Sequence, residues 1–205
     1  MMHARFSLIT ADPLRLDGCL QQMEAEVRPV VEMQPGSLGT ALYADAELGL
    51  AFFESCWASI EALVASEQLP SLGQSDVLRQ AAGTATDERY KLPVFEQDGK
   101  LPPAARLRLT RMDIDPPAVA DAVEAYGDTV VSRLADTDGF NSALLLVNDR
   151  TGHAISETVW RDPAALAASR RVSAEVRAET TAAAGWSIRA VEEYSLLFSS
   201  ARKPL

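Results

Sequence analysis

The sequence of 205 residues is poor in the residues that build metal centres and covalent crosslinks. It has two cysteines, Cys19 and Cys56, two histidines, and no C-x-x-C motif. Two cysteines cannot form the dense disulfide framework of a small secreted domain, and so few thiols and imidazoles provide no ligand set for structural zinc. We therefore expect a cytoplasmic protein with reduced thiols and no bound metal.

Signals for membranes, nucleic acids and nucleotide cofactors are also missing. No apolar run approaches the roughly 18 residues of a membrane-spanning helix, and the N-terminal segment MMHARFSLIT lacks the sections of a signal peptide. Nineteen Lys and Arg against 29 Asp and Glu give a net charge of -10, which repels phosphate backbones and anionic lipids. Glycine-rich phosphate loops and dinucleotide fingerprints are absent. We therefore expect no nucleic-acid partner, no membrane partner and no cofactor.

What the sequence does contain is an internal repeat. Residues match at a constant offset of 103 positions, which is 108 minus 5 for the pair Arg5 and Arg108. The matches include rare or conformationally special residues: Asp12-Pro13 with Asp115-Pro116, Gly36 with Gly139, Gly49 with Gly152, Glu54 with Glu157, and Trp57 with Trp160. Because these matches need no gap, we interpret the chain as a duplication. The predicted organisation is a first repeat at 1–95, a linker at 96–105 and a second repeat at 106–205.

Each repeat has the same order of predicted elements. In the first repeat, an apolar run at 4–10 favours a strand, and an Asp-Pro pair then favours the start of a helix. A hairpin is predicted at 38–57, followed by a second helix and a last strand at 86–95. This β-α-β-β-α-β order is that of a ferredoxin-like unit, which leaves one sheet face uncovered. We therefore predict an α+β fold in which two ferredoxin-like repeats pack sheet to sheet as a pseudo-dimeric α/β barrel. Further homodimerisation stays open.

One segment of each repeat resembles a known family motif. The first segment is AFFESCWASIEALVAS at residues 51–66, and the second is AISETVWRDPAALAAS at residues 154–169. Both resemble the core motif of the antibiotic biosynthesis monooxygenase-like (ABM) domain, in which E-x-x-W ends the third strand and S-x-x-A-[LF] opens the next helix. The matching residues are Glu54, Trp57, Ser59, Ala62 and Leu63, and then Glu157, Trp160, Ala165 and Leu166, with Asp162 in place of the serine. The resemblance implies a dimeric α/β barrel, here written as a tandem fusion in one chain.

The resemblance leaves two functions open. The family includes cofactor-independent monooxygenases that act on polyketide-type phenols, and also haem-degrading enzymes. The haem branch uses a histidine on the second helix and an asparagine on the first strand, whereas here the second helices lack histidine and Ala4 and Leu107 lie near the asparagine position. The first hypothesis is thus a cofactor-independent monooxygenase acting on an aromatic or polyketide-type small molecule. The alternative is a non-catalytic small-ligand-binding or interaction protein on the same barrel, and no catalytic residue can be named.

Four residues are candidates for contact with a small molecule. Trp57 and Trp160 end their strands and are expected to face the helices, where the family has its pocket. Met23 and Tyr126 occupy equivalent positions on the apolar stripe of the first helix in each repeat. All four could form pocket walls or fill the core, because large apolar side chains are commonly buried. Only Tyr126 of these two stripe residues carries a hydroxyl group.

Charged residues are assigned structural roles. By alternation along their strands, Arg5 is expected on the same sheet face as Glu54, and Arg108 on the same face as Glu157. We predict the ion pairs Arg5–Glu54 and Arg108–Glu157 near the interface between the repeats, where they would fix register rather than catalyse. Charged residues of the last helix, including Arg177, are interpreted as solvated surface.

Overall fold

The computed structural model describes residues 1–68 and 76–202, apart from the side chains of residues 183 and 184. The first repeat contains β1 (Met2–Thr10), α1 (Pro13–Gln22), η1 (Met23–Val27), α2 (Arg28–Glu32), β2 (Ser37–Asp45), β3 (Leu50–Trp57), α3 (Ile60–Ala65), η2 (Ser66–Gln68), α4 (Asp76–Gln80) and β4 (Thr84–Gln97). The second contains β5 (Arg106–Asp113), η4 (Pro116–Ala118), α5 (Val119–Ala125), η5 (Tyr126–Val131), α6 (Ser132–Ala135), β6 (Phe140–Val147), β7 (His153–Trp160), α7 (Pro163–Ala168), α8 (Arg170–Ala184) and β8 (Ser187–Ser199).

The strands form one closed order. Hydrogen-bonded neighbours follow β1-β3-β2-β8-β5-β7-β6-β4, and this order closes as a barrel. The predicted α+β fold with two ferredoxin-like repeats and an α/β barrel is therefore confirmed. No helix of the described residues is long and apolar enough to cross a membrane.

Contacts along the chain define two compact units. The first unit is residues 1–90 with 196–205, and the second unit is residues 91–195. Strand β4 thus starts in the first unit and ends in the second, and β8 does the reverse. Each unit therefore takes part of its chain from the other repeat. The boundaries at 1–95, 96–105 and 106–205 describe the duplicated sequence and stay a prediction about domains.

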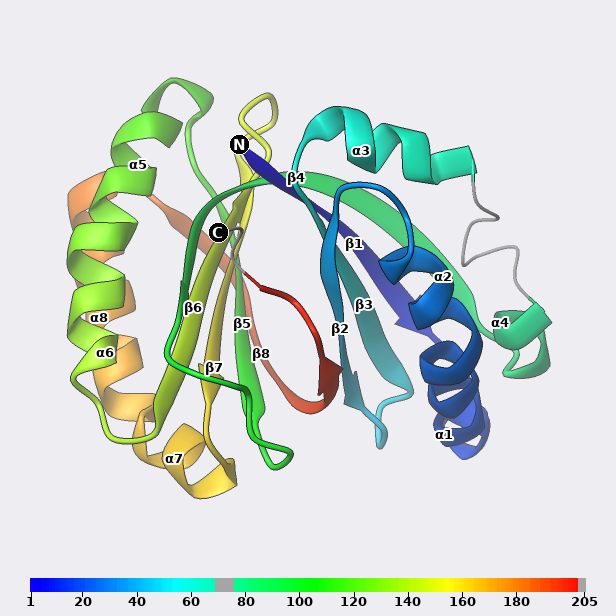
Figure 1. Cartoon of the computed structure of the whole chain (residues 1–205). Coiled ribbons are helices and arrows are strands. Elements are labelled where there is room, and N and C mark those ends of the chain that lie inside the picture. Colours follow the sequence, from blue (N-terminus) through cyan, green and yellow to red (C-terminus); the bar gives the residue numbers. More distant parts are fainter. Residues whose placement is uncertain (69–75, 203–205) are drawn as a thin grey trace. The chain divides into compact units, whose positions relative to one another are not determined.

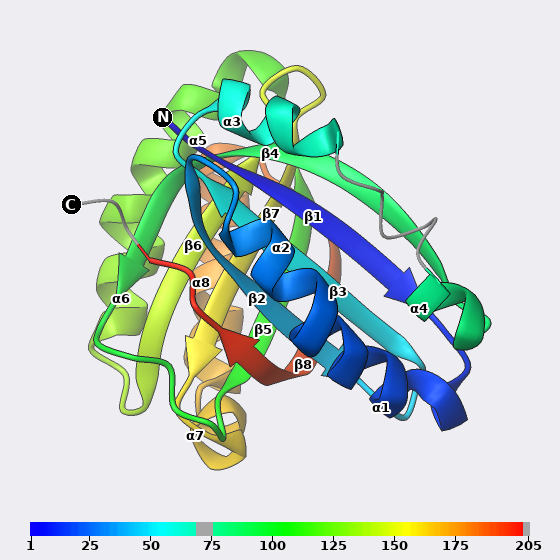
Figure 2. The same ribbon diagram turned by 45° about the vertical axis from the view of Figure 1, so that its right-hand side comes forward.

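In the first unit, helices cover one face of a sheet in which β3 lies between β1 and β2 (Figures 1 and 2). Asp12 caps α1 by accepting a hydrogen bond from the backbone N–H of Leu14 at 3.0 Å, and Pro13 occupies the first turn. Trp57 and Leu63 are fully buried in the core between helices and sheet. The local capping signals and the apolar stripe thus explain this layer.

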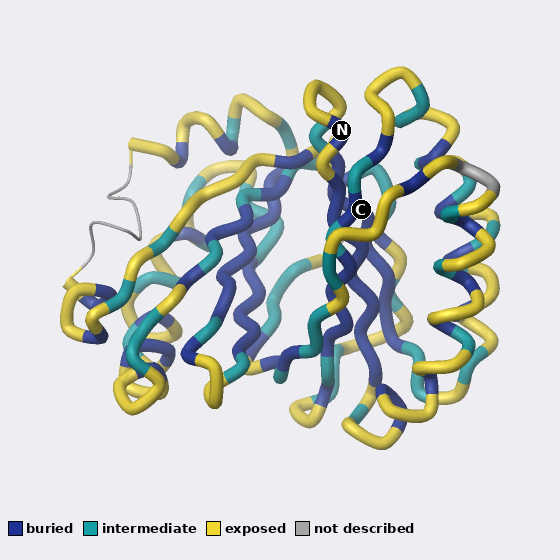
Figure 3. Tube along the Cα trace, turned by 180° about the vertical axis from the view of Figure 1, so that it is seen from behind, coloured by how far each residue is buried: buried dark blue, intermediate teal, exposed yellow. Residues whose placement is uncertain are grey.

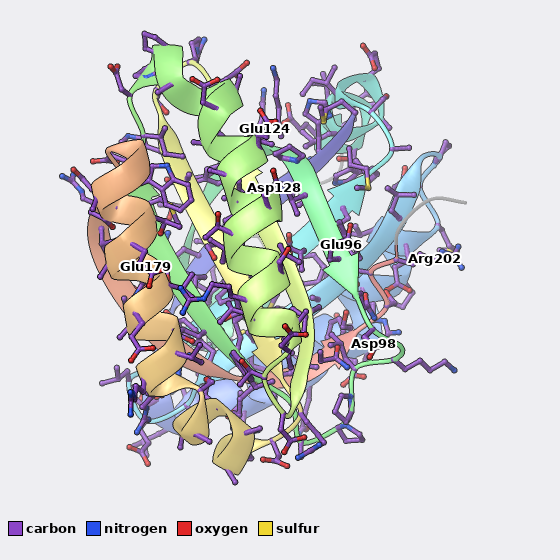
Figure 4. All side chains as sticks on the ribbon, turned by 90° about the vertical axis from the view of Figure 1, so that its left-hand side faces the viewer. Glu96, Asp98, Glu124, Asp128, Glu179 and Arg202 are labelled. Carbon is purple, nitrogen blue, oxygen red and sulfur yellow. The ribbon has the colours of Figure 1, made fainter. Side chains whose placement is uncertain are left out.

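The second unit repeats this arrangement. Strand β7 lies between β5 and β6, and β8 pairs with the other edge of β5. The helical rod formed by α5, η5 and α6 lies beside α8, and both lie in front of the sheet (Figure 4). The central strands are almost continuously buried, whereas the helices alternate between buried and exposed positions (Figure 3). Both faces of this sheet are therefore inaccessible to water, so apolar residues along its strands do not indicate which face the helices cover.

The repeated helix-start motif has a local cause. Ser59 and Asp162 are extended residues whose side chains accept hydrogen bonds from the backbone N–H of Ala62 and Ala165, at 3.3 and 2.8 Å. Each side chain satisfies one of the amides that a helix start leaves unpaired. Serine and aspartate are equivalent in this role, which explains why the second repeat tolerates Asp162.

The register of the first unit contradicts the predicted pair Arg5–Glu54. Strand β1 places Arg5 opposite Ser55 and Phe6 opposite Glu54. Directly opposed residues share a sheet face and neighbours along a strand do not, so Arg5 and Glu54 lie on opposite faces. The prediction was wrong because alternation within one strand does not fix the face relative to another strand. Since both faces are buried, apolar residues did not mark the helix-covered face.

The second unit corrects the pair Arg108–Glu157 in the same way. Strand β5 places Arg108 opposite Thr158 and Leu109 opposite Glu157. Arg108 lies on the helix-covered face and forms an ion pair with Glu193 of β8 at 3.0 Å. The duplicated arginines therefore share a role, but the partners predicted from the repeat are wrong.

Candidate functional site

A pocket lies within the second unit between the sheet and the helices η5 and α8. The polar side chains of its lining come from the strands and from the helices: Arg108, Thr110, Ser156, Thr158, Tyr126, Ser173, Arg177 and Thr180. The cavity volume is about 30 Å³. That is room for a water-sized group, whereas sites for drug-sized ligands have volumes of about 300–1,000 Å³. The pocket is thus polar, but in this conformation it is narrow.

Tyr126 lies at the centre of the pocket wall. It is fully buried and starts the π-helical segment η5, an irregularity that often marks functional positions. Its hydroxyl donates a hydrogen bond to the carbonyl of Leu144 at 3.0 Å and lies 2.8 Å from Oγ of Ser156. Burial raises the pKa of Tyr126 well above its ordinary value of 10. The phenol therefore stays neutral and can orient a ligand, but it cannot act as a base at neutral pH.

Arg108 also lines the pocket, and its hydrogen bonds use all five of its N–H groups. It is 3 % exposed. Its Nε and one Nη donate to Glu193 at 3.3 and 3.0 Å, and the remaining donors reach Ser169 at 2.9 Å, Ser173 at 2.7 Å and the carbonyl of Leu166 at 2.9 Å. A guanidinium offers five donors, so none is left for a ligand. Arg108 therefore ties α7 and α8 to the sheet and adds a positive charge to the pocket.

Arg5 has the matching role in the first unit. Its guanidinium donates to the carbonyl of Leu63 at 3.2 Å and to Oγ of Ser66 at 2.6 Å, and it lies 4.0 Å from Glu67. Leu63 and Ser66 lie one repeat length before Leu166 and Ser169, which accept from Arg108. The repeated arginine thus fastens the end of the second helix to the sheet in each repeat.

Two pocket residues were missed by the sequence analysis. Arg177 was interpreted as solvated surface, but it is partly buried and lines the pocket. It follows the buried Ser173 by four residues, so both lie on one helix face, and this spacing was the available signal. Trp186 is 3 % exposed and also lines the pocket, and it has no match in the first repeat. Because Gly83 stands at the equivalent position of the first repeat, the duplication gives no signal for Trp186.

Of the four residues predicted to contact a small molecule, Tyr126 lines the pocket. Trp160 is fully buried in the adjacent core, where its Nε1 bonds Thr158 at 3.3 Å and its ring packs edge-on against Phe140 at 5.8 Å. It is not among the described residues that line the cavity. Trp57 is likewise buried, with its Nε1 bonded to Ser55 at 3.0 Å.

Two polar positions of the pocket, Tyr126 and Ser156, correspond to apolar residues in the first repeat. Met23 replaces Tyr126 and Phe53 replaces Ser156, and both lie in the core of the first unit. Phe53 packs edge-on against Phe198 with ring centroids 6.4 Å apart. The polar pocket therefore depends on residues that are specific to the second repeat.

The residues of this pocket do not fit haem. None of the described lining side chains is a histidine, a cysteine or a carboxylate. Tyr126 is the lining phenol, and its hydroxyl is already engaged with Ser156 and Leu144. The cavity of about 30 Å³ is also far too small for a porphyrin. We therefore derive no chemistry through haem.

Comparisons with known proteins agree with this fold. No family model matches the sequence. Two uncharacterized proteins of Mycobacterium tuberculosis are similar along the whole of this chain. One is 26% identical over 205 residues, and the match covers 87% of that protein's length. The other is 24% identical over 204 residues, and the match covers 91% of that protein's length.

Solved structures give the same picture. A suspected monooxygenase of Fusobacterium nucleatum has a TM-score of 0.73 and 12% identity, covering 100% of this chain and 96% of that one. An anthrone oxidase-like protein has a TM-score of 0.66 and 14% identity, and the match covers 97% of this chain and 92% of that one. A heme-binding protein of Thermus thermophilus has a TM-score of 0.57 and 11% identity, and the match covers 95% of this chain and 90% of that one. At these identities the similarity establishes the fold, that of the ABM-like dimeric α/β barrels, and function has to be argued from the site.

Proposed function

We propose that this protein binds a small organic molecule in the pocket of the second unit. The observation that carries the proposal is the substitution of polar for apolar groups at equivalent positions. Tyr126 and Ser156 occupy places that Met23 and Phe53 fill in the first repeat. Burying polar groups is unfavourable compared with a packed apolar core, and the first repeat demonstrates that the fold accepts the apolar version. A ligand that uses these groups accounts for their presence.

The test is a ligand screen by thermal shift and ligand-observed NMR on the full chain. Ser156→Phe copies the first repeat and fills the cavity, and Tyr126→Phe removes one hydroxyl with little change in shape. Tyr43→Phe makes the same chemical change in the first unit and serves as the matched control. We expect compounds that bind the wild type and the control to be lost in Ser156→Phe and weakened in Tyr126→Phe. Binding that survives both pocket changes, or a wild type that binds no compound, would reject the proposal.

A second candidate function is cofactor-independent oxygenation of an aromatic or polyketide-type molecule in the same pocket. It is favoured by the positive charges of Arg108 and Arg177 beside the aromatic rings of Tyr126 and Trp186. Such a field stabilises the deprotonated, electron-rich form of a bound carbon acid. That carbanion reacts with O₂, and the net change R₂CH₂ + O₂ → R₂C=O + H₂O needs no further reductant. No described lining residue is a carboxylate or an imidazole, so the proton would pass to solvent.

Oxygen uptake separates this candidate from simple binding. Hydroquinones and anthrone-like phenols are the substrates to assay, with Tyr126→Phe as the pocket variant and Trp160→Phe as the variant of the adjacent core. Uptake that falls in Tyr126→Phe and keeps the stoichiometry of one O₂ per product supports an oxygenase. Binding without uptake for every compound would leave the protein a ligand-binding barrel.

A further inference from the structure

We infer that the ligand of this pocket is a small organic carboxylate, whose anionic oxygens are received by Arg177 and Trp186. The inference rests on the proposed function, because it names the chemistry of the molecule that the same pocket binds. It adds two residues, Arg177 and Trp186, that are not among the polar replacements of apolar residues on which the proposed function rests.

The first observation is a buried donor without an acceptor. Trp186 is 3 % exposed, and its Nε1 has no hydrogen-bond partner among the residues that the structure describes. The N–H groups of Trp57 and Trp160 both have side-chain acceptors two residues earlier on their own strands. Buried polar groups are nearly always paired, because an unmade hydrogen bond leaves their desolvation uncompensated. An acceptor supplied by a ligand would satisfy Trp186.

The second observation is a guanidinium without a hydrogen-bonded partner. Arg177 lines the same pocket, and its guanidinium forms no hydrogen bond or ion pair with any residue in the described part of the chain. Arg108 is the opposite case, because its five donors are all engaged. Desolvation and then the nearby Arg108 lower the pKa of Arg177, against an opposing effect of the Glu193 carboxylate, so Arg177 holds its charge in a partly dry wall beside a like charge. Arg177 is thus the guanidinium that remains available.

The local charge balance favours an anion. Glu193 is the carboxylate that acts electrostatically on both Arg108 and Arg177, and it already forms ion pairs with Arg108 and Arg170, at 3.0 and 2.8 Å. Figure 4 shows Glu124, Asp128 and Glu179 on the helices that cover this sheet, and all three are exposed. Water and salt screen exposed charges strongly, so they do not cancel the positive charge inside the pocket.

The shape of the site selects a carboxylate with an apolar body. A guanidinium and one indole N–H form a small donor set that matches the two oxygens of a carboxylate, and guanidinium–carboxylate pairs bind in a planar, often bidentate way. The rest of the wall is apolar and includes Val130, Leu134 and Val176. A strongly hydrated dianion such as phosphate would leave most of its oxygens against these side chains. The cavity of about 30 Å³ further favours a compact acid.

The experiment compares acetate with acetamide, which has nearly the same shape as acetate and no charge. Dissociation constants are measured by calorimetry on the full chain. We expect acetate to bind the wild type at least about tenfold more tightly than acetamide, the usual range for a charge-assisted hydrogen bond. Arg177→Gln and Trp186→Phe should each weaken acetate binding about tenfold or more and change acetamide binding less than about twofold. Arg171→Gln is the matched control, because Arg171 is exposed on the same helix and pairs with Glu175.

The outcomes separate this inference from the proposed function. If neutral compounds bind in a manner sensitive to Ser156→Phe, while carboxylates bind no better and Arg177→Gln has no effect, the carboxylate inference is wrong and the proposed function stands. An equal loss of acetate binding in Arg171→Gln would show a general charge effect and also overturn the inference. If no compound of either class binds, both proposals fail.

Discussion

Gly139 and Ala165 approach each other so closely that a β-carbon on Gly139 would lie 2.4 Å from the Ala165 β-carbon. Gly139 also has a φ of +81°, a region that is unfavourable for residues with a side chain. The same relationship recurs in the first repeat, where a β-carbon on Gly36 would lie 2.6 Å from that of Ala62. The glycine and the alanine have the same spacing in both repeats because each unit makes the same close contact between a turn and a helix.

The first prediction concerns this contact. Gly139→Ala should lower the free energy of unfolding by more than ~1–2 kcal/mol, because the positive φ alone costs that much and the methyl group also meets Ala165. Gly127→Ala is the control, since no heavy atom lies within 4 Å of a β-carbon there and the residue is helical. It should stabilise by ~0.5–1 kcal/mol. Urea unfolding of both variants measures the two changes in the free energy of unfolding. Equal changes in Gly139→Ala and Gly127→Ala would contradict the explanation.

The features that the sequence predicted well are those with local physical causes. An aspartate followed by proline starts a helix wherever it occurs, and a glycine such as Gly49 is required where a side chain would meet the carbonyl of Ala11 at 2.3 Å. These requirements do not depend on distant packing. The duplicated order of strands and helices, and with it the barrel, could therefore be predicted from the sequence alone.

The features that the sequence did not predict depend on tertiary context. Arg5 was placed on the wrong sheet face because both faces are buried, so its apolar neighbours gave no direction. Arg177 was taken as surface because a charged residue on an amphipathic helix is usually solvated. Only the position of α8 on the sheet reveals that Arg177 lines a pocket, and only the fold brings Trp186 to the same place.

The second prediction contrasts the two arginines of the pocket. Arg108→Met should cost on the order of 3 kcal/mol of stability, because it breaks a partly buried ion pair, removes one of the two arginines that hold Glu193 and removes a donor to the carbonyl of Leu166. Arg177→Met should change stability by less than about 1 kcal/mol, since the Arg177 guanidinium has no hydrogen bond or ion pair among the described residues to lose. Chemical denaturation without ligand makes the comparison. A large loss in Arg177→Met would mean that this arginine is structural.

The third prediction concerns pH. Glu54 is 1 % exposed, and burial raises its pKa from 4.5 to about 7, against a weaker opposing effect of the Cys56 thiol. The folded state then keeps a proton that the unfolded state releases above about pH 4.5, so this group contributes most stability below that pH. Its contribution falls as the pH rises from about 4.5 to 7 and is constant above. Glu54→Gln should therefore gain stability relative to the wild type across this interval, by up to the order of 3 kcal/mol.

The control for this titration is Glu47→Gln, which changes an exposed carboxylate of the same unit. Denaturant unfolding at pH 5 and pH 8 gives the required difference. The explanation fails if the stability gap between Glu54→Gln and the wild type is the same at both values, or if Glu47→Gln reproduces its change.

The last prediction tests whether the end of the chain completes the first unit. Ser200 donates a backbone hydrogen bond to Thr40 at 2.8 Å, and Phe198 packs on Phe53, with the guanidinium carbon of Arg28 at 4.7 Å from its ring centroid. Phe198→Ala should thus cost on the order of 3 kcal/mol, whereas Leu197→Ala, at an exposed position of the same strand, should cost less than about 1 kcal/mol. Hydrogen exchange should show the loss of protection in β2 and β3 before β6 and β7, because the contacts removed belong to the first unit. Uniform loss in both units would contradict this assignment and indicate that the two repeats unfold as one cooperative body.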